Sequence, residues 1–355
     1  MILCDNIVFE LQAVGGVSKY WSKTITRLDA SGRDIAFLEG RRAEKNAFRR
    51  ELTLSKPIIR EPGPVILRRF SGPSARSAVF HSSYYRISGR ARANVVTIHD
   101  LMNEKYPTGL RDPVLSYLKR RACRHAQAIL AVSEQTRRDL LAHYPFVDPG
   151  RVYVAYNGVD EEFFPEPIAT AFDAGGLALS PKEYFLYVGT RGFCKNFHYV
   201  LRFVSEARMQ GLGCPLVVVG APLSEAERDA AEALGIPGDA LRQVSGVSDA
   251  VLRRLYSNCV ALLIPSIYEG FGLPAAEAAR CGALVLTARG SALDEIAGET
   301  DYAFDLKREG EIARVLALGF DNARAEAERV RMQARSLMFN WSASAQKLLE
   351  IYDEF

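Results

Sequence analysis

The chain has 355 residues, which is more than one ordinary hydrophobic core accommodates and is enough for two domains of about 150–180 residues each. Hydrophobic residues make up 48% and charged residues 25%, a composition that excludes a disordered or fibrous protein. Net charge is +3, but residues 1–160 hold 26 Lys and Arg against 15 Asp and Glu, and the remainder holds 19 against 27.

The sequence contains no apolar run of about 18 residues, the length that a membrane span requires. Its start, MILCDNIVFELQ, lacks the basic region and cleavage site of a signal peptide. The six cysteines are scattered and form no C-x-x-C pair. We therefore expect a cytoplasmic chain with free thiols and no zinc site.

The first half alternates short apolar runs with helical stretches, a pattern typical of a parallel α/β layer. The runs predict strands at Ile2–Phe9, Ile35–Leu38, Ala78–Phe80, Val95–Ile98, Ala128–Val132 and Val152–Ala155. The stretches between them predict helices at Ser18–Leu28, Pro113–Cys123 and Glu134–His143.

A proline-containing, acidic segment, Asn157–Ala174, then indicates a linker, after which the alternation restarts. Here the predicted strands are Tyr184–Val188, Leu216–Val219, Leu241–Gln243, Ala261–Pro265 and Leu284–Thr287. The predicted helices are Phe197–Gln210, Glu225–Leu234, Asp249–Ser257, Pro274–Cys281 and Ser342–Tyr352. The restart predicts an α/β protein with two Rossmann-like domains, residues 1–165 and 166–338, followed by a C-terminal helix in 339–355.

Residues 262–282, LLIPSIYEGFGLPAAEAARCG, carry the strongest motif. A strand ends at Pro265, a glycine-containing loop follows, and Pro274 opens a helix whose first-turn N–H groups can bind an anion. Glu269 lies in the loop and Glu277 lies one turn inside the helix, so we expect them to reach different parts of one ligand. A carboxylate can accept two neighbouring hydroxyl groups, which suits a hexose or a ribose.

Three smaller motifs also follow predicted strands. Arg191 and Lys195 lie in YFLYVGTRGFCKN, where both cations can converge on a diphosphate or simply lie exposed at a helix start. Gly15 and Gly16 form a turn before a helix but do not match the dinucleotide pattern G-x-G-x-x-G. His99 ends the Val95–Ile98 strand, at the edge where open α/β sheets bind ligands, although such a histidine is often only a satisfied polar group.

The motif of residues 262–282 resembles the signature of glycosyltransferase family 4, whose members are retaining enzymes of the GT-B type. The resemblance implies that Glu269 contacts the transferred sugar and that Glu277 binds the ribose of the donor. It further implies that the backbone of Phe271, Gly272 and Leu273 lies against the sugar and the diphosphate.

The same resemblance assigns the smaller motifs. Arg191 and Lys195 would stabilise the leaving diphosphate, His99 would lie close to the sugar, and Gly15 and Gly16 would face the donor phosphate and the acceptor. Many members carry arginine immediately before the lysine, where this chain has cysteine. The assignment of Lys195 is therefore firmer than that of Arg191.

As a whole, the resemblance implies a GT-B fold in which two parallel sheets face a central cleft and the C-terminal helix crosses back to the first domain. A hexose, with a mannose-like sugar favoured, would pass from a nucleotide-diphosphate sugar to an acceptor hydroxyl. A diphosphate oxygen would take the acceptor proton, so that the configuration is retained. The chain has no D-x-D triplet, and we expect it to need no metal and no cofactor.

The partners predicted are a nucleotide-sugar donor and a glycan or lipid-linked glycan acceptor, as in cell-surface polysaccharide or lipopolysaccharide synthesis. Residues 41–92 hold 13 basic and 3 acidic side chains, which suits either an anionic membrane surface at the inner face of the cell membrane or an ordinary solvated face. No nucleic-acid-binding motif accompanies this charge. The alternatives are a nucleotide-sugar epimerase or hydrolase on the same frame and a non-enzymatic sugar-nucleotide-binding protein.

Overall fold

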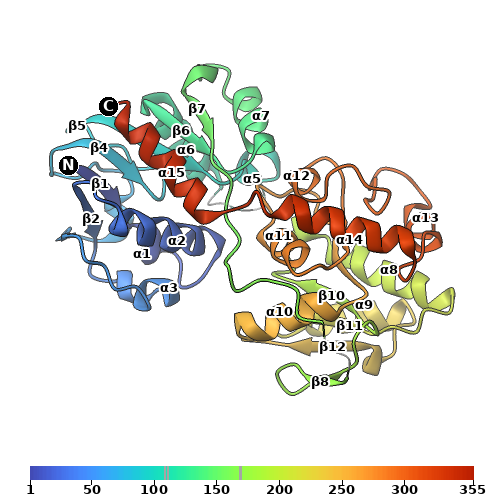
Figure 1. Ribbon diagram of the computed structural model, residues 1–355. Coiled ribbons are helices and arrows are strands. Elements are labelled where there is room, and N and C mark those ends of the chain that lie inside the picture. The colour runs from blue at the N-terminus through green and yellow to red at the C-terminus, as the bar shows by residue number, and fades with distance from the viewer. Residues whose placement is uncertain (108, 110–111, 168–169) are drawn as a thin grey trace. The chain divides into compact units, whose positions relative to one another are not determined.

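The computed structural model describes residues 1–107, 109, 112–167 and 170–355 (Figure 1). The chain divides into two compact units, unit 1 with residues 1–158 and 340–355, and unit 2 with residues 159–339. The first boundary lies seven residues before the predicted one, because Val159–Pro165 belongs to unit 2. The C-terminal helix returns to unit 1.

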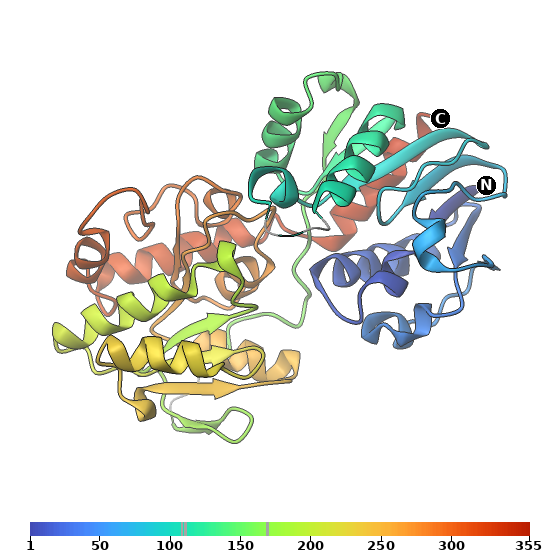
Figure 2. The ribbon, with the colours of Figure 1, turned by 180° about the vertical axis from the view of Figure 1, so that it is seen from behind.

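Unit 1 is built on a sheet of seven parallel strands in the order β3-β2-β1-β4-β5-β6-β7, the order of a doubly wound fold. The strands are β1 Ile2–Asp5, β2 Ile35–Glu39, β3 Ile58–Arg60, β4 Ser77–Ser82, β5 Ala91–Ile98, β6 Ala128–Ala131 and β7 Val152–Val154. The helices are α1 Val8–Leu11, α2 Gly16–Ala30, α3 Ala47–Arg50, α4 Val65–Arg68, α5 Met102–Lys105, α6 Asp112–His125, α7 Glu134–His143 and α15 Trp341–Asp353. The two opposite views place α15 and α6 on opposite faces of this sheet (Figures 1 and 2).

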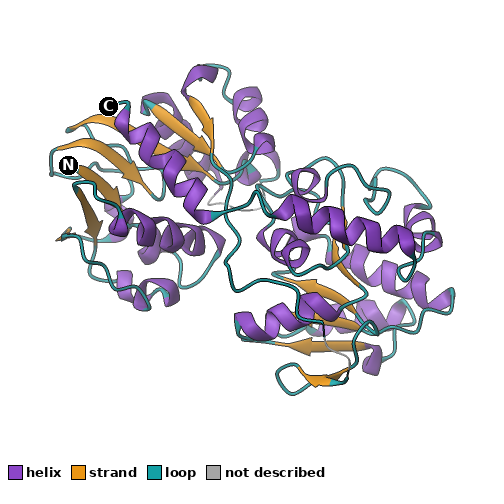
Figure 3. Ribbon diagram, in the orientation of Figure 1, coloured by secondary structure: helices purple, strands orange, loops and turns teal. Residues whose placement is uncertain are grey.

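One predicted strand of unit 1 is too long. The apolar run Ile2–Phe9 is a strand only as far as Asp5 and continues as α1 (Figure 3). Between the two, the buried Asn6 side chain donates to Glu39 Oε1 at 2.7 Å and accepts from Trp21 Nε1 at 2.6 Å. These contacts hold the chain where it leaves the sheet, and periodicity alone cannot locate such a point within a short apolar run.

Unit 2 repeats the architecture with five parallel strands in the order β12-β11-β10-β13-β14. These strands are β10 Phe185–Val188, β11 Leu216–Val219, β12 Leu241–Val244, β13 Ala261–Ile264 and β14 Val285–Thr287, and a separate antiparallel pair joins β8 Phe172–Asp173 and β9 Ala178–Leu179. The helices are α8 Phe197–Met209, α9 Glu225–Ala233, α10 Asp249–Asn258, α11 Leu273–Arg280, α12 Leu293–Ala297, α13 Glu311–Ala317 and α14 Ala323–Ser336. The sequence-based prediction of two parallel Rossmann-like sheets is thus confirmed.

Helix α15 is part of the core of unit 1. The Tyr352 hydroxyl lies 2.6 Å from Nδ1 of the buried His81 on β4. At the other end of the helix, the ring and backbone of Trp341 pack directly on Gly158, where a Cβ would collide with them. A glycine at position 158 is therefore needed for this close approach.

Candidate active site

The loop that carries Lys195 is held against the loop that carries Glu269. Residues Phe193–Lys195 form a single 3-10 turn, and Asn196 then adopts a left-handed conformation (φ 53°) that starts α8. Asn196 Nδ2 donates to the Pro265 carbonyl at 3.2 Å, and the Ile267 amide donates to the Cys194 carbonyl at 2.8 Å. Both loops follow the carboxyl ends of neighbouring strands, β10 and β13, where parallel sheets place ligand sites.

These two loops bring Lys195 and Glu269 together. Lys195 Nζ lies 2.6 Å from Glu269 Oε1. The side chains are 32% and 13% exposed, so solvent and small molecules reach the pair. A partly exposed ion pair of this kind contributes little to stability, about 0–1 kcal/mol, and a ligand can exchange its partners at low cost.

The glycine loop ends at Gly272, whose conformation requires glycine. Its φ is +98°, and a Cβ there would lie 2.6 Å from Leu293 Cδ2. The Phe271 ring is buried edge-on against Phe339, with centroids 5.2 Å apart. The Phe271 side chain therefore anchors the loop, while Leu273 begins α11.

Glu277 occupies a buried position on α11. It is 4% exposed, and its Oε2 accepts the Tyr256 hydroxyl from α10 at 3.2 Å. Burial, followed by the carboxylate of Glu277, raises the pKa of Tyr256 well above its ordinary value, so Tyr256 stays protonated and donates to Glu277. Tyr256 thus sets the orientation of a carboxylate assigned by resemblance to the donor ribose.

Arg191 is held on several sides. Its Nε lies 2.6 Å from Glu227 Oε1, its Nη2 donates to the Pro222 carbonyl at 2.8 Å, and its guanidinium stacks over the Phe197 ring. The side chain is only 8% exposed. Its Nη1 is buried without a hydrogen-bond partner, close to Gly220 at the end of β11. A buried donor without a partner is costly unless a ligand satisfies it.

Glu227 is a partner of Arg191 that the sequence motifs did not reveal. Its Oε1 accepts from Arg191, while Oε2 accepts from the backbone and hydroxyl of Ser224 in a capping box that starts α9. Burial alone would raise the pKa of Glu227, but the hydrogen bonds from Arg191 and Ser224 lower it below its ordinary value. The S-x-x-E pattern at 224–227 was the available signal, and it indicates a helix start but not the partner Arg191.

The four charged residues predicted for unit 2 do not all contact one another. The structure pairs Lys195 with Glu269 and gives Arg191 and Glu277 partners of their own. A hollow of about 420 Å³ is lined by Arg191 but by none of the other three. All four nevertheless follow carboxyl ends of strands β10 and β13 or lie on the helix after β13.

In unit 1, the predicted glycine turn opens α2. Gln12 Oε1 accepts the Ser18 amide at 3.2 Å and so caps the helix. A Cβ on Gly15 would lie only 2.8 Å from this oxygen. Gly16 has open space where its side chain would be. The turn therefore leaves the backbone at Gly16 accessible.

His99 lies beside this helix, just after β5. Its ring packs edge-on against Tyr20 of α2, with centroids 4.8 Å apart, and it is 9% exposed. Burial, although opposed by Asp100, lowers the pKa of His99 to about 4, so the ring is neutral at pH 7. Asp100 accepts the Met102 amide at 3.1 Å where α5 begins, which is a structural role.

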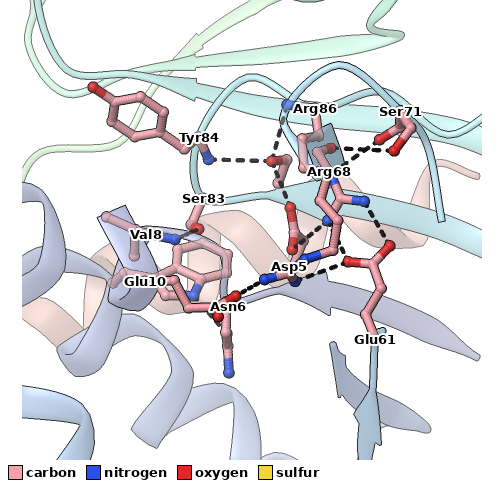
Figure 4. A network of polar contacts seen from close by, with 12 residues as sticks. Asp5, Asn6, Val8, Glu10, Glu61, Arg68, Ser71, Ser83, Tyr84 and Arg86 are labelled. Atoms are coloured by element: carbon pink, nitrogen blue, oxygen red, sulfur yellow. Dashed lines mark hydrogen bonds and ion pairs between the residues drawn. The ribbon is translucent and has the colours of Figure 1, made fainter. Parts of the chain in front are cut away.

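Of the 13 basic side chains of residues 41–92, eight are exposed, while Arg49, Arg68 and Arg86 are buried. Arg86 has no exposed side-chain surface and binds Asp5 at 3.0 Å and Glu61 at 2.7 Å, and Arg68 binds Glu10 and Glu61 (Figure 4). These side chains turn toward one another at the end of β1. They neutralise each other and contribute no charge to an outer surface.

Other features bear on the remaining expectations. All six cysteines are free. In the part of the chain that the structure describes, no group of three or more His, Cys, Asp or Glu side chains is placed to hold a metal ion. Across the same described residues, no helix combines the length and apolar character needed to cross a membrane.

Two doubly wound parallel units with polar residues at the carboxyl edges of their sheets define the GT-B class of fold. Residues 14–163 match the family described as Glycosyltransferase Family 4, and residues 172–336 match Glycosyl transferases group 1. The chain belongs to glycosyltransferase family 4.

Curated relatives are similar over most of this chain. It is 28% identical over 243 residues to the MMP alpha-(1->4)-mannosyltransferase of Mycolicibacterium hassiacum, covering 67% of this chain and 56% of that protein. Against the serotype-specific mannosyltransferase WbdA of Escherichia coli it is 28% identical, covering 76% of this chain and 35% of that protein. The chain thus spans less than two thirds of these two relatives.

Solved structures share the fold. WaaG, a glycosyltransferase involved in lipopolysaccharide biosynthesis, superposes with a TM-score of 0.69 at 13% identity over 99% of both chains. Anabaena HepE in complex with UDP-glucose gives a TM-score of 0.73 at 15% identity over 100% of this chain and 99% of that chain. At these identities the likeness establishes the GT-B architecture alone.

Proposed function

We propose that this chain is a retaining, metal-independent glycosyltransferase that moves a hexose from a nucleotide-diphosphate sugar to an acceptor hydroxyl. The observation that carries the proposal is the Lys195–Glu269 pair, 2.6 Å apart and partly exposed beside the start of α11. A cation and a carboxylate that neutralise each other in the free chain have separate natural partners in a nucleotide sugar, the diphosphate and the sugar hydroxyls.

In the proposed reaction, the bond between the sugar anomeric carbon and the diphosphate oxygen breaks as the acceptor oxygen bonds to the same face of that carbon. The acceptor proton passes to an oxygen of the leaving diphosphate. Lys195 and the free Nη1 of Arg191 stabilise the negative charge that develops there. The chain itself provides charge and orientation and no covalent nucleophile.

A mannose-like donor is favoured because the mannosyltransferases above are similar to this chain. For the acceptor we propose a glycan or lipid-linked glycan of cell-surface polysaccharide or lipopolysaccharide synthesis. The enzyme would act in the cytoplasm, at the inner face of the membrane. His99 would contact the sugar as a neutral hydrogen-bonding group, in agreement with its lowered pKa.

The test begins with thermal shift of the full chain against GDP-mannose, UDP-glucose and their free diphosphates, because a donor that binds the folded state raises the melting temperature. The stabilising donor is then incubated with and without lipid-linked glycan acceptors. Transfer only with acceptor supports the proposal. Release of the nucleotide from the donor without any acceptor would indicate a hydrolase. Conversion of the donor sugar into another sugar would indicate an epimerase, and stabilisation by the donor without turnover would indicate a binding protein.

Two further measurements check the finer parts. NMR coupling constants of the product report the anomeric configuration, which we expect to match that of the donor. Turnover in EDTA is expected to equal that with added magnesium or manganese. Activity that EDTA abolishes and either metal restores would refute metal independence.

A further inference from the structure

Exposed apolar side chains gather on three segments of unit 1: α4 with the two residues after it, α6, and the loop 143–146. Figure 2 shows unit 1 from the side that carries α6. The exposed apolar side chains are Ile66 (65%), Leu67 (65%), Phe70 (43%), Val114 (42%), Tyr117 (60%) and Phe146 (37%). Together with the basic side chains of α6 between them, Arg120, Arg121 and Arg124, they form what we call the α4–α6 surface.

Direct contacts join the three segments. Arg121 Nη1 donates to the Phe70 carbonyl at 3.0 Å, which links α6 to the end of α4. The guanidinium groups of Arg120 and Arg124 lie 5.8 and 4.9 Å from the centre of the Phe146 ring. Tyr117, Arg120 and Phe146 also line one shallow hollow of about 440 Å³. The surface is therefore continuous.

The charge of this surface has one sign. Residues 64–70, 113–125 and 143–146 contain no Asp or Glu. Of the three other Lys and Arg side chains in these segments, Arg68 and Lys119 are buried and paired, with Glu61 at 3.1 Å and with Glu104 at 2.8 Å. The guanidinium of the third, the half-buried Arg69, lies 5.6 Å from the centre of the Tyr84 ring. What reaches solvent is a set of arginines among large apolar side chains.

We propose that the α4–α6 surface docks on a lipid bilayer that contains anionic headgroups. Apolar side chains that insert at the boundary between headgroups and acyl chains, with arginines that reach the phosphates, are the features of an interfacial membrane contact. A merely solvated face would mix both signs of charge and expose fewer large apolar groups. Nucleic acid would use the arginines but leave Ile66 and Leu67 without a partner.

The proposal deepens the proposed function, because a lipid-linked acceptor is presented at such a bilayer. Its test is independent, since membrane binding needs neither donor nor acceptor. The full chain is sedimented with vesicles of phosphatidylcholine alone and of phosphatidylcholine mixed with phosphatidylglycerol. We expect it to pellet with the mixed vesicles and to be released by high salt, because salt screens the attraction.

Two double variants address the two components of the contact. Arg120→Glu with Arg124→Glu is expected to lower the partition coefficient at least about 25-fold, since each basic residue near the surface contributes about a fivefold change. Ile66→Ser with Leu67→Ser is expected to lower it as well, at both low and high salt. The four side chains are exposed, so the fold is expected to survive both changes.

Matched controls lie in unit 2. Arg228→Glu with Lys307→Glu repeats the charge change at exposed positions, and Met209→Ser with Leu337→Ser removes apolar groups that are 76% and 62% exposed. Both controls are expected to bind vesicles as the parent chain does. Unchanged thermal shifts with nucleotide sugars in every variant would separate a failure of docking from a failure of the proposed function.

Three outcomes would overturn the proposal. Equal pelleting with both kinds of vesicle, or equal losses in the controls, would remove the specific surface. A vesicle-free dimer that Ile66→Ser with Leu67→Ser abolishes, without binding to mixed vesicles, would assign the surface to a second copy of the chain. Binding to DNA duplexes but not to vesicles, lost with Arg120 and Arg124, would assign it to nucleic acid.

Discussion

The carboxyl edges of the two sheets both carry ion pairs, but they differ in burial. In unit 1, Arg86 and its partner Asp5 are 0% and 1% exposed. In unit 2, Lys195 and its partner Glu269 are 32% and 13% exposed, at 2.6 Å from each other. The five strands of unit 2 follow the same order as the first five of unit 1, so the strand order alone does not account for the difference.

The comparison indicates that burial distinguishes charges that stabilise the fold from charges that remain available to a ligand. A buried ion pair is costly to form, because both charges lose their hydration. Removing one partner is still more costly, because the remaining buried charge is neither paired nor hydrated. A partly exposed pair costs little to open. Disrupting the first should therefore reduce stability, and disrupting the second should reduce turnover.

The largest effect is expected in unit 1. Arg86→Met leaves Asp5 and Glu61 without their shared cation, and we expect the free energy of unfolding in urea to fall by about 3–5 kcal/mol. The surviving folded fraction should keep its affinity for nucleotide sugars. A loss below about 1 kcal/mol would show that the network is not structural.

The next effect belongs to unit 2. Lys195→Ala and Glu269→Gln should each reduce turnover about 10²–10³-fold, because each removes a fixed group that stabilises the transition state. Their melting temperatures should change little, since the exposed pair contributes at most about 1 kcal/mol. The exposed Lys307→Ala is the control, and near-normal turnover in both site variants would contradict the assignment.

The third prediction concerns pH and unit 1. Burial lowers the pKa of His81 to about 3, against about 6.5 in an unfolded chain, so the unfolded chain takes up a proton first. Stability from this histidine is complete above about pH 6.5 and declines as the pH falls toward 3, by about 1.4 kcal/mol per pH unit. His81→Gln should therefore lose about 2 kcal/mol less than the parent between pH 7 and pH 5. Identical pH profiles would refute it.

The smallest effect is expected at Glu227, whose side chain is 23% exposed. Glu227→Gln loses the charge-assisted bond to Arg191, and we expect about a tenfold loss in kcat/KM for the donor. Ser224→Ala removes the helix cap but leaves the carboxylate beside Arg191, so only stability should fall, by about 1 kcal/mol. Equal losses in kcat/KM in both variants would show that Glu227 acts only by stabilising the start of the helix.

Most of the architecture could be predicted because apolar runs and helix signals alternate clearly. The prediction failed where periodicity is absent. Helix α14, Ala323–Ser336, is rich in Ala, Glu and Arg and buries few residues, so its pattern lacks an apolar stripe. Strand β3 is only Ile58–Arg60 at the sheet edge, too short for a distinct signal.

For the candidate site, the motifs point to individual loops but do not reveal which of their side chains pair. Lys195 and Glu269 are 74 positions apart, and their contact follows from β10 and β13 being neighbours in the sheet. Neither motif alone predicts that these two strands are neighbours. The partnership of Arg191 with Glu227 was likewise hidden, because the same carboxylate completes a capping box.

The central claim is that a nucleotide sugar opens the Lys195–Glu269 pair. A crystal structure with the bound nucleoside diphosphate of the stabilising donor tests it most directly. The account predicts Lys195 Nζ within hydrogen-bonding distance of a phosphate oxygen and Arg191 Nη1 satisfied by the ligand. A diphosphate bound elsewhere, with Lys195 and Glu269 still in contact as in the free chain, would contradict it.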